Sequence, residues 1–105
     1  MRFCASCENV NEESSNACDD CGGSVFVRAL VIGRSTACDL TINDQSVSQQ
    51  HLAAAEIGQD ILVRDLNSTN GTYVNERKNK ISGSARVSPN DTLLLGTYQL
   101  SVAEI

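Results

Sequence analysis

Short apolar segments separated by turn residues fill most of this chain, and they restrict its fold class more than any other feature. A β-branched run covers residues 25–32 and ends at Gly33. Similar segments recur along the rest of the chain, at residues 40–42, 61–66, 72–74, 85–87, 92–95 and 98–103. Turn signals such as Asn43-Asp44 and Ser82-Gly83 lie between them. Strands spaced in this way predict an all-β fold, either a β-sandwich or a barrel.

Residues 48–57 conflict with this pattern. The segment begins with a serine that could cap a helix, contains three consecutive alanines and ends before Gly58. Local propensity alone assigns these features to a short helix. We expect pairing with neighbouring strands to override that preference, so that the segment forms a strand.

Two C-x-x-C pairs occupy the first 24 residues, and they consist of Cys4, Cys7, Cys18 and Cys21. Four thiolates complete the tetrahedral coordination of Zn²⁺, and each C-x-x-C turn directs two sulfurs to one point. The residues between the pairs are polar, so this segment buries too little apolar surface to fold without a metal. We therefore predict a structural Zn²⁺ in residues 1–24, which resemble a short zinc ribbon, and a second domain over residues 25–105.

Three other uses of these cysteines have less support in the sequence. A redox dithiol needs a C-x-x-C at a helix N-terminus in a βαβ context, and none is visible. Disulfide bonds need an oxidising compartment, which no feature indicates. Catalytic zinc needs an open coordination position, and four cysteine ligands leave none. The fifth cysteine, Cys38, lies next to Asp39, and we interpret it as a small, partly buried apolar side chain.

Charge and composition argue against several partners. The chain has 105 residues and a net charge of -5, and residues 1–24 hold one basic and five acidic side chains. Binding to nucleic acid or to an anionic membrane surface needs a basic footprint, so we expect neither. The sequence shows neither an apolar run of about 20 residues nor a secretory pattern at its N-terminus. We therefore expect a cytoplasmic protein, and we expect it to be a monomer.

The stretch from Asp65 to Asn75 is rich in polar groups. Asn70-Gly71 between two strand-like segments is a hairpin signal, because both residues tolerate the positive φ of tight turns. A hairpin needs only these two residues, whereas hydroxyl, amide and glycine residues continue from Ser68 to Thr72. This surplus of polar groups predicts a binding site in the loop.

Three motifs stand in order along the chain: Gly33-Arg34, Ser48-Gln49-Gln50-His51 and Ser68-Thr69-Asn70-Gly71-Thr72. In these motifs residues 25–105 resemble a forkhead-associated (FHA) domain, and the resemblance extends to Asp65-Leu66, Val74-Asn75 and Leu95-Gly96. It implies an FHA-type β-sandwich of about eleven strands, whose loops at one end bind phosphothreonine peptides. It also implies an interaction module and not an enzyme.

The resemblance assigns contacts with the ligand to residues of the three motifs. Arg34, Ser48 and Thr69 match the positions that contact the phosphate. A guanidinium and two hydroxyls suit an anion that carries several acceptor oxygens. Asn70 matches the asparagine that holds the main chain of the ligand, for which an amide offers both a donor and an acceptor. Gln49 matches a peptide-contacting position at which relatives often carry arginine or asparagine.

Three further residues are expected to shape the site. Gly33 would let the strand end turn so that Arg34 points into the site, and Gly71 would permit the turn that follows Asn70. His51, the only histidine, would brace two loops by hydrogen bonding. The residues that the resemblance implies for the site thus fall into contact residues and residues that hold the loops.

A basic cluster follows the loop and consists of Arg77, Lys78 and Lys80. In the family this turn lies at the opposite end of the sandwich from the binding loops. We therefore interpret the cluster as a solvated face.

The sequence thus predicts a phosphothreonine-peptide-binding adaptor in serine/threonine kinase signalling, with a structural zinc ribbon. Residues 1–24 contain no threonine, so the phosphothreonine is expected on another protein. Three alternatives stay open: an FHA-fold scaffold that binds without phosphate, a zinc-ribbon nucleic-acid or transcription factor, and a dithiol oxidoreductase.

Overall fold

The computed structural model describes residues 1–105 and contains eleven β-strands and one 3-10 helix. The strands are β1 (Arg2–Cys4), β2 (Val10–Asn11), β3 (Phe26–Arg28), β4 (Leu30–Gly33), β5 (Leu40–Thr41), β6 (Leu52–Ile57), β7 (Asp60–Asp65), β8 (Thr72–Val74), β9 (Ser84–Val87), β10 (Thr92–Leu95) and β11 (Tyr98–Ser101). The helix η1 covers Val102–Glu104. None of the chain's helical structure has the length and apolar character that a membrane crossing requires. The expected all-β class is confirmed.

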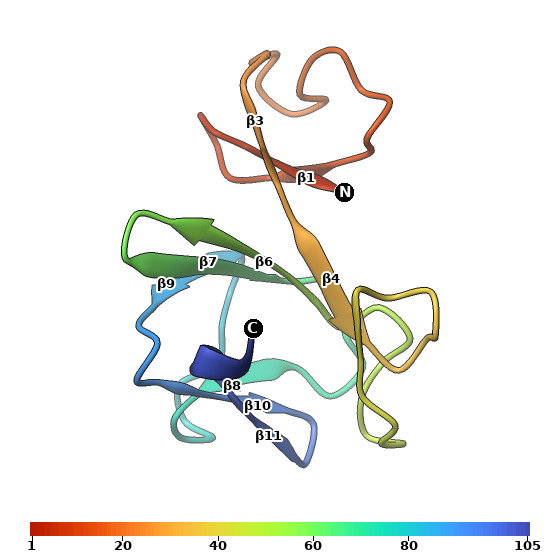
Figure 1. Ribbon diagram of the computed structural model, residues 1–105, viewed down its shortest axis with the longest axis vertical. Helices are drawn as coiled ribbons and strands as arrows, with labels where there is room; N and C mark the ends of the chain where they lie inside the picture. The colour runs from red at the N-terminus through yellow and green to blue at the C-terminus, as the bar shows by residue number, and fades with distance from the viewer.

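Two sheets face each other and form a β-sandwich (Figure 1). The larger sheet has the order β5-β4-β6-β7-β9, and the smaller one has the order β11-β10-β8. Neighbouring strands are antiparallel except for β4 and β5, which run parallel. The sheets therefore bury one common core between them.

The core between the sheets contains thirteen buried residues. Leu93 and Leu95 of β10 point into it and are fully buried, whereas Leu94 between them belongs to the other face. Ile32, Leu52 and Val63 contribute from the larger sheet. This alternation is what a strand with two differently packed faces requires.

Strand β6 forms where local propensity favours a helix, so the expected override is confirmed. Each of its six residues pairs with a residue of β7, from Leu52 with Asp65 to Ile57 with Asp60. Ala54 faces the core of the sandwich, while Ala53 and Ala55 pack in a second apolar cluster on the outer face. Alanines suit this strand because both of its faces are covered and closely packed.

Two predicted strand boundaries are wrong. Residues 25–32 form two strands, because β3 pairs with β1 and β4 pairs with β6 on either side of Ala29. The predicted strand 98–103 ends at Ser101, after which the chain turns into η1. In the first case a continuous apolar run leaves one sheet and enters another, which periodicity alone does not reveal.

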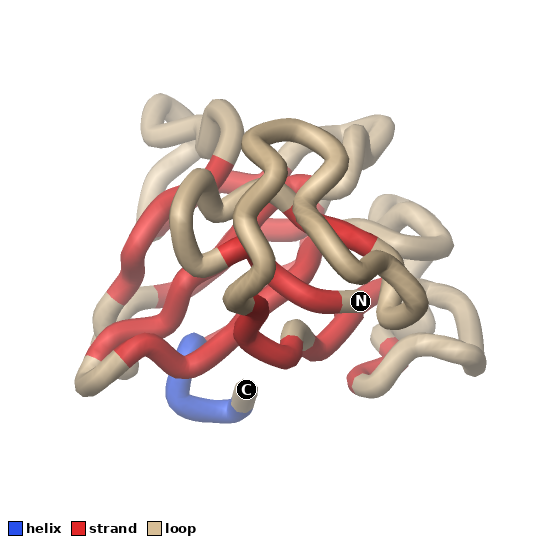
Figure 2. The backbone as a smooth tube through the Cα atoms, turned by 90° about the horizontal axis from the view of Figure 1, so that it is seen from above, coloured by secondary structure: helices blue, strands red, loops and turns tan.

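The N-terminal residues form a separate three-stranded sheet with the order β2-β1-β3 (Figure 1). We call residues 1–28 the cysteine unit, because the pairing of β3 with β1 carries its sheet to Arg28. The division at residue 24 expected from the sequence stays a prediction. Seen from above, the loops of the cysteine unit lie in front of the sandwich (Figure 2).

The cysteine unit packs on the outer face of the larger sheet. Phe3 is fully buried and belongs to one apolar cluster with Ala53, Ala55 and Leu62 of the sandwich. The carboxylate of Glu8 accepts a hydrogen bond from Ser84 Oγ at 2.9 Å and pairs with Arg86 at 3.3 Å. The two units therefore share an apolar and a polar contact.

Candidate functional site

Three loops converge at one end of the sandwich. They follow β4, precede β6 and follow β7, and the first two lie at the right of Figure 1. The backbone amide of Arg34 donates to Ser48 O at 2.9 Å, and that of Thr69 donates to Ser48 Oγ at 3.0 Å. The three residues expected to contact phosphate, which come from three separate segments, are therefore brought together.

Arg34 presents most of its guanidinium to solvent. Its Nε donates to the carbonyl of Val47 at 3.1 Å, which fixes the base of the fork. The side chain is exposed and takes part in no ion pair within the chain. Its two terminal nitrogens are therefore available to an anion from outside.

Gly33 has a structural role in addition to the one expected. A Cβ at this position would lie 2.3 Å from the carbonyl oxygen of Gln49 and 2.9 Å from that of Ser48. Real Cβ atoms do not approach backbone atoms so closely, so any side chain would push the two loops apart. Gly33 thus permits close approach of the loops, and the expected role in the turn before Arg34 stays a prediction.

Ser48 and Thr69 each carry a hydroxyl where the three loops meet. Ser48 Oγ already accepts the Thr69 amide, so its own proton remains free to be donated. The hydroxyl of Thr69 has no partner within the chain, and Thr69 is exposed. Both hydroxyls are therefore available to an acceptor from outside the chain.

Asn70 and Gln49 belong to two of the same converging loops. Asn70 Nδ2 donates to the carbonyl of Ser46 at 2.9 Å, which leaves its Oδ1 without a partner. The Gln49 side chain is exposed, while its carbonyl accepts hydrogen bonds from the Ser35 amide and from Cys38 Sγ. Cys38 is half-buried.

His51 holds the loops from inside the protein. The side chain is fully buried, its Nδ1 accepts from the Ser48 amide at 3.0 Å, and its Nε2 lies 2.9 Å from Gly71 O. Because Nδ1 is an acceptor, the proton of the neutral ring sits on Nε2 and is donated to Gly71 O. Burial lowers the pKa of His51, and the Gly71 carbonyl and the Asp65 carboxylate oppose that shift. The neutral ring therefore forms hydrogen bonds with a backbone group of each of the two loops, the Ser48 amide and the Gly71 carbonyl.

Asp65 organises the loop after β7, a role that sequence reasoning did not assign to it. Its carboxylate accepts from the amide and the hydroxyl of Ser68, and from Thr72 Oγ1 at 2.7 Å. The aspartate three residues before a serine is the signal that could have revealed this local turn. Gly71 then adopts a φ of +81°, which a residue with a Cβ rarely does.

Ser46 is a second residue that sequence reasoning missed. Its Oγ donates to Asp44 Oδ1 at 2.6 Å and accepts from the Thr97 amide at 2.9 Å, while its carbonyl holds Asn70. The Ser46 hydroxyl and amide lower the pKa of Asp44. The spacing of Asp44 and Ser46 could have indicated their hydrogen bond from the sequence. The contact of Ser46 with Thr97, in the turn between β10 and β11, joins residues far apart in sequence, and no local pattern indicates it.

The basic cluster after the loop is closer to the site than expected. Its turn does lie at the far end of β8, where the Asn75 amide donates to Thr92 O at 2.7 Å. Lys80, however, forms an antiparallel backbone bridge with Tyr73 after the turn. Its Cε lies so close to Gly71 that a Cβ added to that glycine would be only 3.1 Å away. A strand of three residues spans only about 10 Å, so a lysine side chain reaches back along it.

The four cysteines of the first 24 residues gather at one point. Their Sγ atoms all lie within 4.8 Å of one another, with Cys4 and Cys21 3.5 Å apart and Cys7 and Cys18 3.6 Å apart. Sulfurs at about 2.3 Å from a tetrahedral Zn²⁺ are about 3.8 Å apart. The cluster therefore has the size and the donor set that Zn²⁺ requires.

The two C-x-x-C turns have the same backbone form. The amide of Glu8 donates to Cys4 O at 2.9 Å, and the amide of Gly22 donates to Cys18 O at 2.8 Å. Both residues have positive φ, +64° for Glu8 and +77° for Gly22. Positive φ favours glycine, yet the first turn carries Glu8. The contacts of its carboxylate with Ser84 and Arg86 of the sandwich explain why a glutamate stands there.

Asn11 supports the cysteine cluster and was not singled out from the sequence, where one asparagine in a polar loop gives no signal. It is buried, its Nδ2 donates to Cys18 Sγ at 3.5 Å, and its Oδ1 accepts from the Asp19 amide at 3.1 Å. The backbone amide of Cys21 lowers the pKa of Cys18 to about 6, aided by the Asp20 amide and by Asn11. Such donors favour the thiolate that binds metal.

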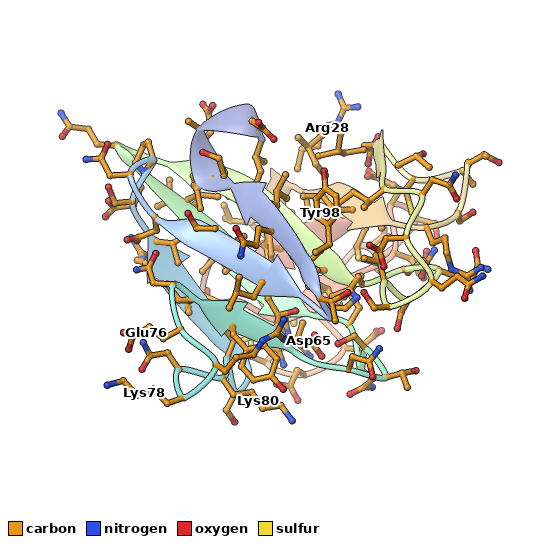
Figure 3. All side chains as sticks on the ribbon, turned by 90° about the horizontal axis from the view of Figure 1, so that it is seen from below. Arg28, Asp65, Glu76, Lys78, Lys80 and Tyr98 are labelled. Carbon is orange, nitrogen blue, oxygen red and sulfur yellow. The ribbon has the colours of Figure 1, made fainter.

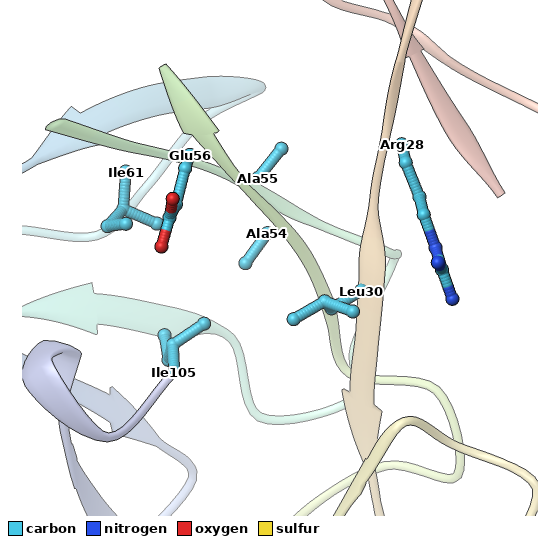
Figure 4. Close-up of a pocket in the computed structure, with 7 residues that line it drawn as sticks. All are labelled: Arg28, Leu30, Ala54, Ala55, Glu56, Ile61 and Ile105. Carbon is cyan, nitrogen blue, oxygen red and sulfur yellow. The ribbon is translucent and has the colours of Figure 1, made fainter. Parts of the chain in front are cut away.

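An apolar cavity of about 300 Å³ lies elsewhere, beside the C-terminal residue (Figure 4). None of the converging loop residues lines it, and Arg28 and Glu56 are its only charged side chains. Their opposite charges give it no preference for an anion. The cavity is therefore separate from the loop site.

The fold and the loop site define a β-sandwich interaction domain, and comparison with known proteins identifies its family. The FHA domain model matches residues 30–96, which are more than half of the chain. The chain belongs to the FHA domain family. Domains of this family are interaction modules rather than enzymes.

Individual relatives agree with this assignment. The FHA domain-containing protein PS1 of Arabidopsis thaliana is 32% identical over 87 residues, which are 81% of this chain. The chain spans only 6% of the length of PS1. The FHA domain of CT664 from Chlamydia trachomatis is 26% identical, with a TM-score of 0.62 over 74% of this chain and 80% of that chain. The N-terminal FHA domain of Rad53p from S. cerevisiae, solved in complex with a phosphothreonine peptide, is 27% identical, with a TM-score of 0.53 over 63% of this chain and 54% of that chain.

Proposed function

We propose that this chain is a phosphothreonine-peptide-binding adaptor in serine/threonine kinase signalling. One observation supports the proposal above the others. Arg34, Ser48 and Thr69 converge at one end of the sandwich with donor groups that no residue of the chain uses.

The chemistry of these groups fits a phosphate. A phosphothreonine carries about -1.5 to -2 charges and three strong acceptor oxygens. The Arg34 guanidinium supplies charge and a planar fork, and the two hydroxyls supply further donors. Each charge-assisted hydrogen bond of this kind contributes about 1.5–3 kcal/mol. Asn70 Oδ1 can accept a main-chain amide of the ligand, and the Gln49 side chain can contact a neighbouring ligand residue.

We further propose that Cys4, Cys7, Cys18 and Cys21 bind one structural Zn²⁺. The distances among the sulfurs and the buried donor Asn11 support this proposal. The ion would cross-link β1 and the loop after β2, and all-cysteine coordination gives it no open position for catalysis.

The partner in this proposal is a phosphothreonine-containing protein that meets the domain in trans. The cysteine unit packs on the outer face of the larger sheet, away from the converging loops, so it leaves them accessible (Figure 1). We place the protein in the cytoplasm, because free thiolate ligands persist in a reducing compartment.

Fluorescence polarisation with a phosphothreonine peptide library tests the phosphopeptide proposal. We expect binding that is lost for the unphosphorylated peptides and weakened for matched phosphoserine peptides. Arg34→Ala should weaken binding at least about tenfold, because it removes charge-assisted hydrogen bonds. Arg28→Ala removes an exposed arginine remote from the loops and serves as the matched control. Equal binding of phosphorylated and unphosphorylated peptides would instead identify a phosphate-independent scaffold.

Elemental analysis of the purified full chain tests the zinc proposal. We expect about one Zn²⁺ per chain in the protein as isolated, and release of that ion when a thiol-specific mercurial blocks the cysteines. Rapid alkylation of the thiols in the absence of any bound metal would contradict the proposal and favour a redox dithiol.

A further inference from the structure

A second cavity, which is polar, borders the loop that carries Thr69 and Asn70. It measures about 400 Å³, and its lining includes Arg64, Asp65, Asn67, Lys80 and Ser82. Ile81 is its only apolar lining residue. Figure 3 shows Asp65 and Lys80 on the same side of the molecule. The cavity is therefore built for a polar ligand rather than an apolar one.

Two cations of this cavity have no partner in the protein. Neither Arg64 nor Lys80 takes part in an ion pair or in a side-chain hydrogen bond within the chain. Lys78, in contrast, pairs with Glu76 at 3.2 Å. In a chain with a net charge of -5, two unpaired cations at one cavity form a local anion-attracting site.

The one acidic residue of the cavity, Asp65, offsets the charge of only one of the two cations, so the lining keeps an excess of positive charge. Both oxygens of the Asp65 carboxylate accept hydrogen bonds, one from the Ser68 amide and the other from the Ser68 and Thr72 hydroxyls. Those bonds direct Asp65 into its own loop. The exposed amide residue Asn67 and the exposed hydroxyl of Ser82 can add neutral donors at the cavity.

Lys80 brings the cavity next to the proposed peptide site, because its side chain contacts the residue after Asn70, Gly71. The aliphatic end of Lys80 packs at Gly71, where its Cε would lie 3.1 Å from a Cβ. Tyr73 Oη donates to the carbonyl of Asn70 at 3.1 Å, and the Arg77 guanidinium stacks over the Tyr73 ring at 5.1 Å from its centre. A peptide held at Asn70 would therefore pass close to Lys80, with Arg77 adding positive charge nearby.

We propose that Arg64 and Lys80 form a second anion subsite for a carboxylate or phosphate group on the same peptide, at a position flanking the phosphothreonine. This inference rests on the proposed function, and it specifies the ligand as a phosphothreonine peptide with a neighbouring acidic or phosphorylated residue. The subsite selects among phosphothreonine peptides, while the phosphate contact of Arg34 supplies the basal affinity.

Peptide titrations test the subsite directly. The reference is a neutral peptide with one phosphothreonine, and the test peptides carry one glutamate or one phosphoserine at successive positions on either side. At one position we expect binding about three- to tenfold tighter than for the reference, the range for one or two partly exposed ion pairs. The gain should shrink as salt is raised. The glutamate and phosphoserine peptides distinguish a carboxylate from a phosphate subsite.

Variants locate the gain in the cavity. Lys80→Met keeps the aliphatic stem that packs at Gly71 and removes the charge, and Arg64→Gln removes the other cation. We expect the double variant to bind the reference peptide as the wild type does and to lose the gain from the second anion. Lys78→Met, an equal change of charge at an exposed lysine, should retain the gain.

The outcomes separate the two proposals. Wild-type protein that binds the reference peptide but gains nothing from a second anion at any position overturns the subsite and leaves the proposed function intact. A gain that survives the double variant also overturns the subsite. Failure to bind any phosphothreonine peptide overturns both proposals.

Discussion

The cysteine unit and the sandwich are held together by different interactions. In the sandwich, thirteen buried residues fill the space between two sheets. In the cysteine unit, Phe3 is the only buried apolar side chain apart from cysteines, and it packs on the sandwich rather than within the unit. The sandwich thus contains its own core, whereas the cysteine unit has none and packs on the sheet beneath it, so we expect the proposed Zn²⁺ to supply much of its stability.

This difference also explains an unusual strand. Ala53 and Ala55 would face water if the sandwich stood alone, yet both are buried by the cysteine unit. Alanine is small enough for close approach of the second unit and apolar enough to lie beneath it. The sandwich therefore carries a surface adapted to its neighbour, while its binding loops lie elsewhere.

Removal of the proposed Zn²⁺ should show the largest difference in stability between the two units. With Cys18→Ser, or with chelator, we expect bound zinc to fall from about one ion per chain to none, because three thiolates hold the ion less well. Amide hydrogen exchange should become fast in β1, β2 and β3 and stay slow in β6, β7 and β10. Simultaneous loss of protection throughout the chain would show that the units fold as one.

A cavity created in the core of the sandwich should have the opposite effect: it should destabilise the sandwich and leave zinc binding by the cysteine unit unchanged. Leu93→Ala removes a fully buried side chain between the sheets, so we expect the free energy of unfolding to fall by about 2–5 kcal/mol in urea titrations. Zinc content of the folded variant should remain at about one ion per chain. A change below about 1 kcal/mol would contradict the assignment of the core.

Protonation of His51 should weaken the sandwich in mildly acidic solution. The folded pKa lies below 6.5, so below about pH 6.5 the unfolded chain binds a proton that the native chain does not. The free energy of unfolding should therefore fall as the pH decreases through this range, by at most about 1.4 kcal/mol per pH unit, and stay level above it.

His51→Gln isolates this effect, because the chain has no other histidine. The difference in unfolding free energy between wild type and variant should narrow as the pH falls below about 6.5. NMR titration of the ring protons should give a pKa below 6.5 in the native protein. A native pKa above 6.5 would contradict the neutral ring described between Ser48 and Gly71.

The smallest effect concerns Glu8, which links the two units. Glu8→Ala and Glu8→Gly both remove the contacts with Ser84 and Arg86, but only glycine adopts the positive φ without strain. We expect the glycine variant to be more stable than the alanine variant by about 1 kcal/mol, and to lie within about 1 kcal/mol of wild type. Chelator titrations of the metal-loaded proteins measure both differences, and equal stability of the two variants would exclude backbone strain at Glu8.

The sequence predicted the features that depend on local chemistry. Turn residues marked most strand boundaries, and the paired cysteines marked a metal-sized cluster. The motif residues Arg34, Ser48 and Thr69 indicated three loops that the structure brings together. The strand over residues 25–32 was misjudged at Ala29, because an apolar run does not show when it changes its pairing partner.

The tertiary structure alone decided the features that depend on residues distant in sequence. Helix propensity differs among residues by less than about 1 kcal/mol, so pairing and burial on both faces outweigh it at Ala53 and Ala55. Gly33 is required by a carbonyl sixteen positions further along, at Gln49. Lys80 reaches Gly71 because it lies opposite Tyr73, two residues after Gly71. The propensity of a segment depends on its own residues, so it can be read from the local sequence. Close approach of two segments depends also on the partner segment, and the local sequence does not show which segment that is.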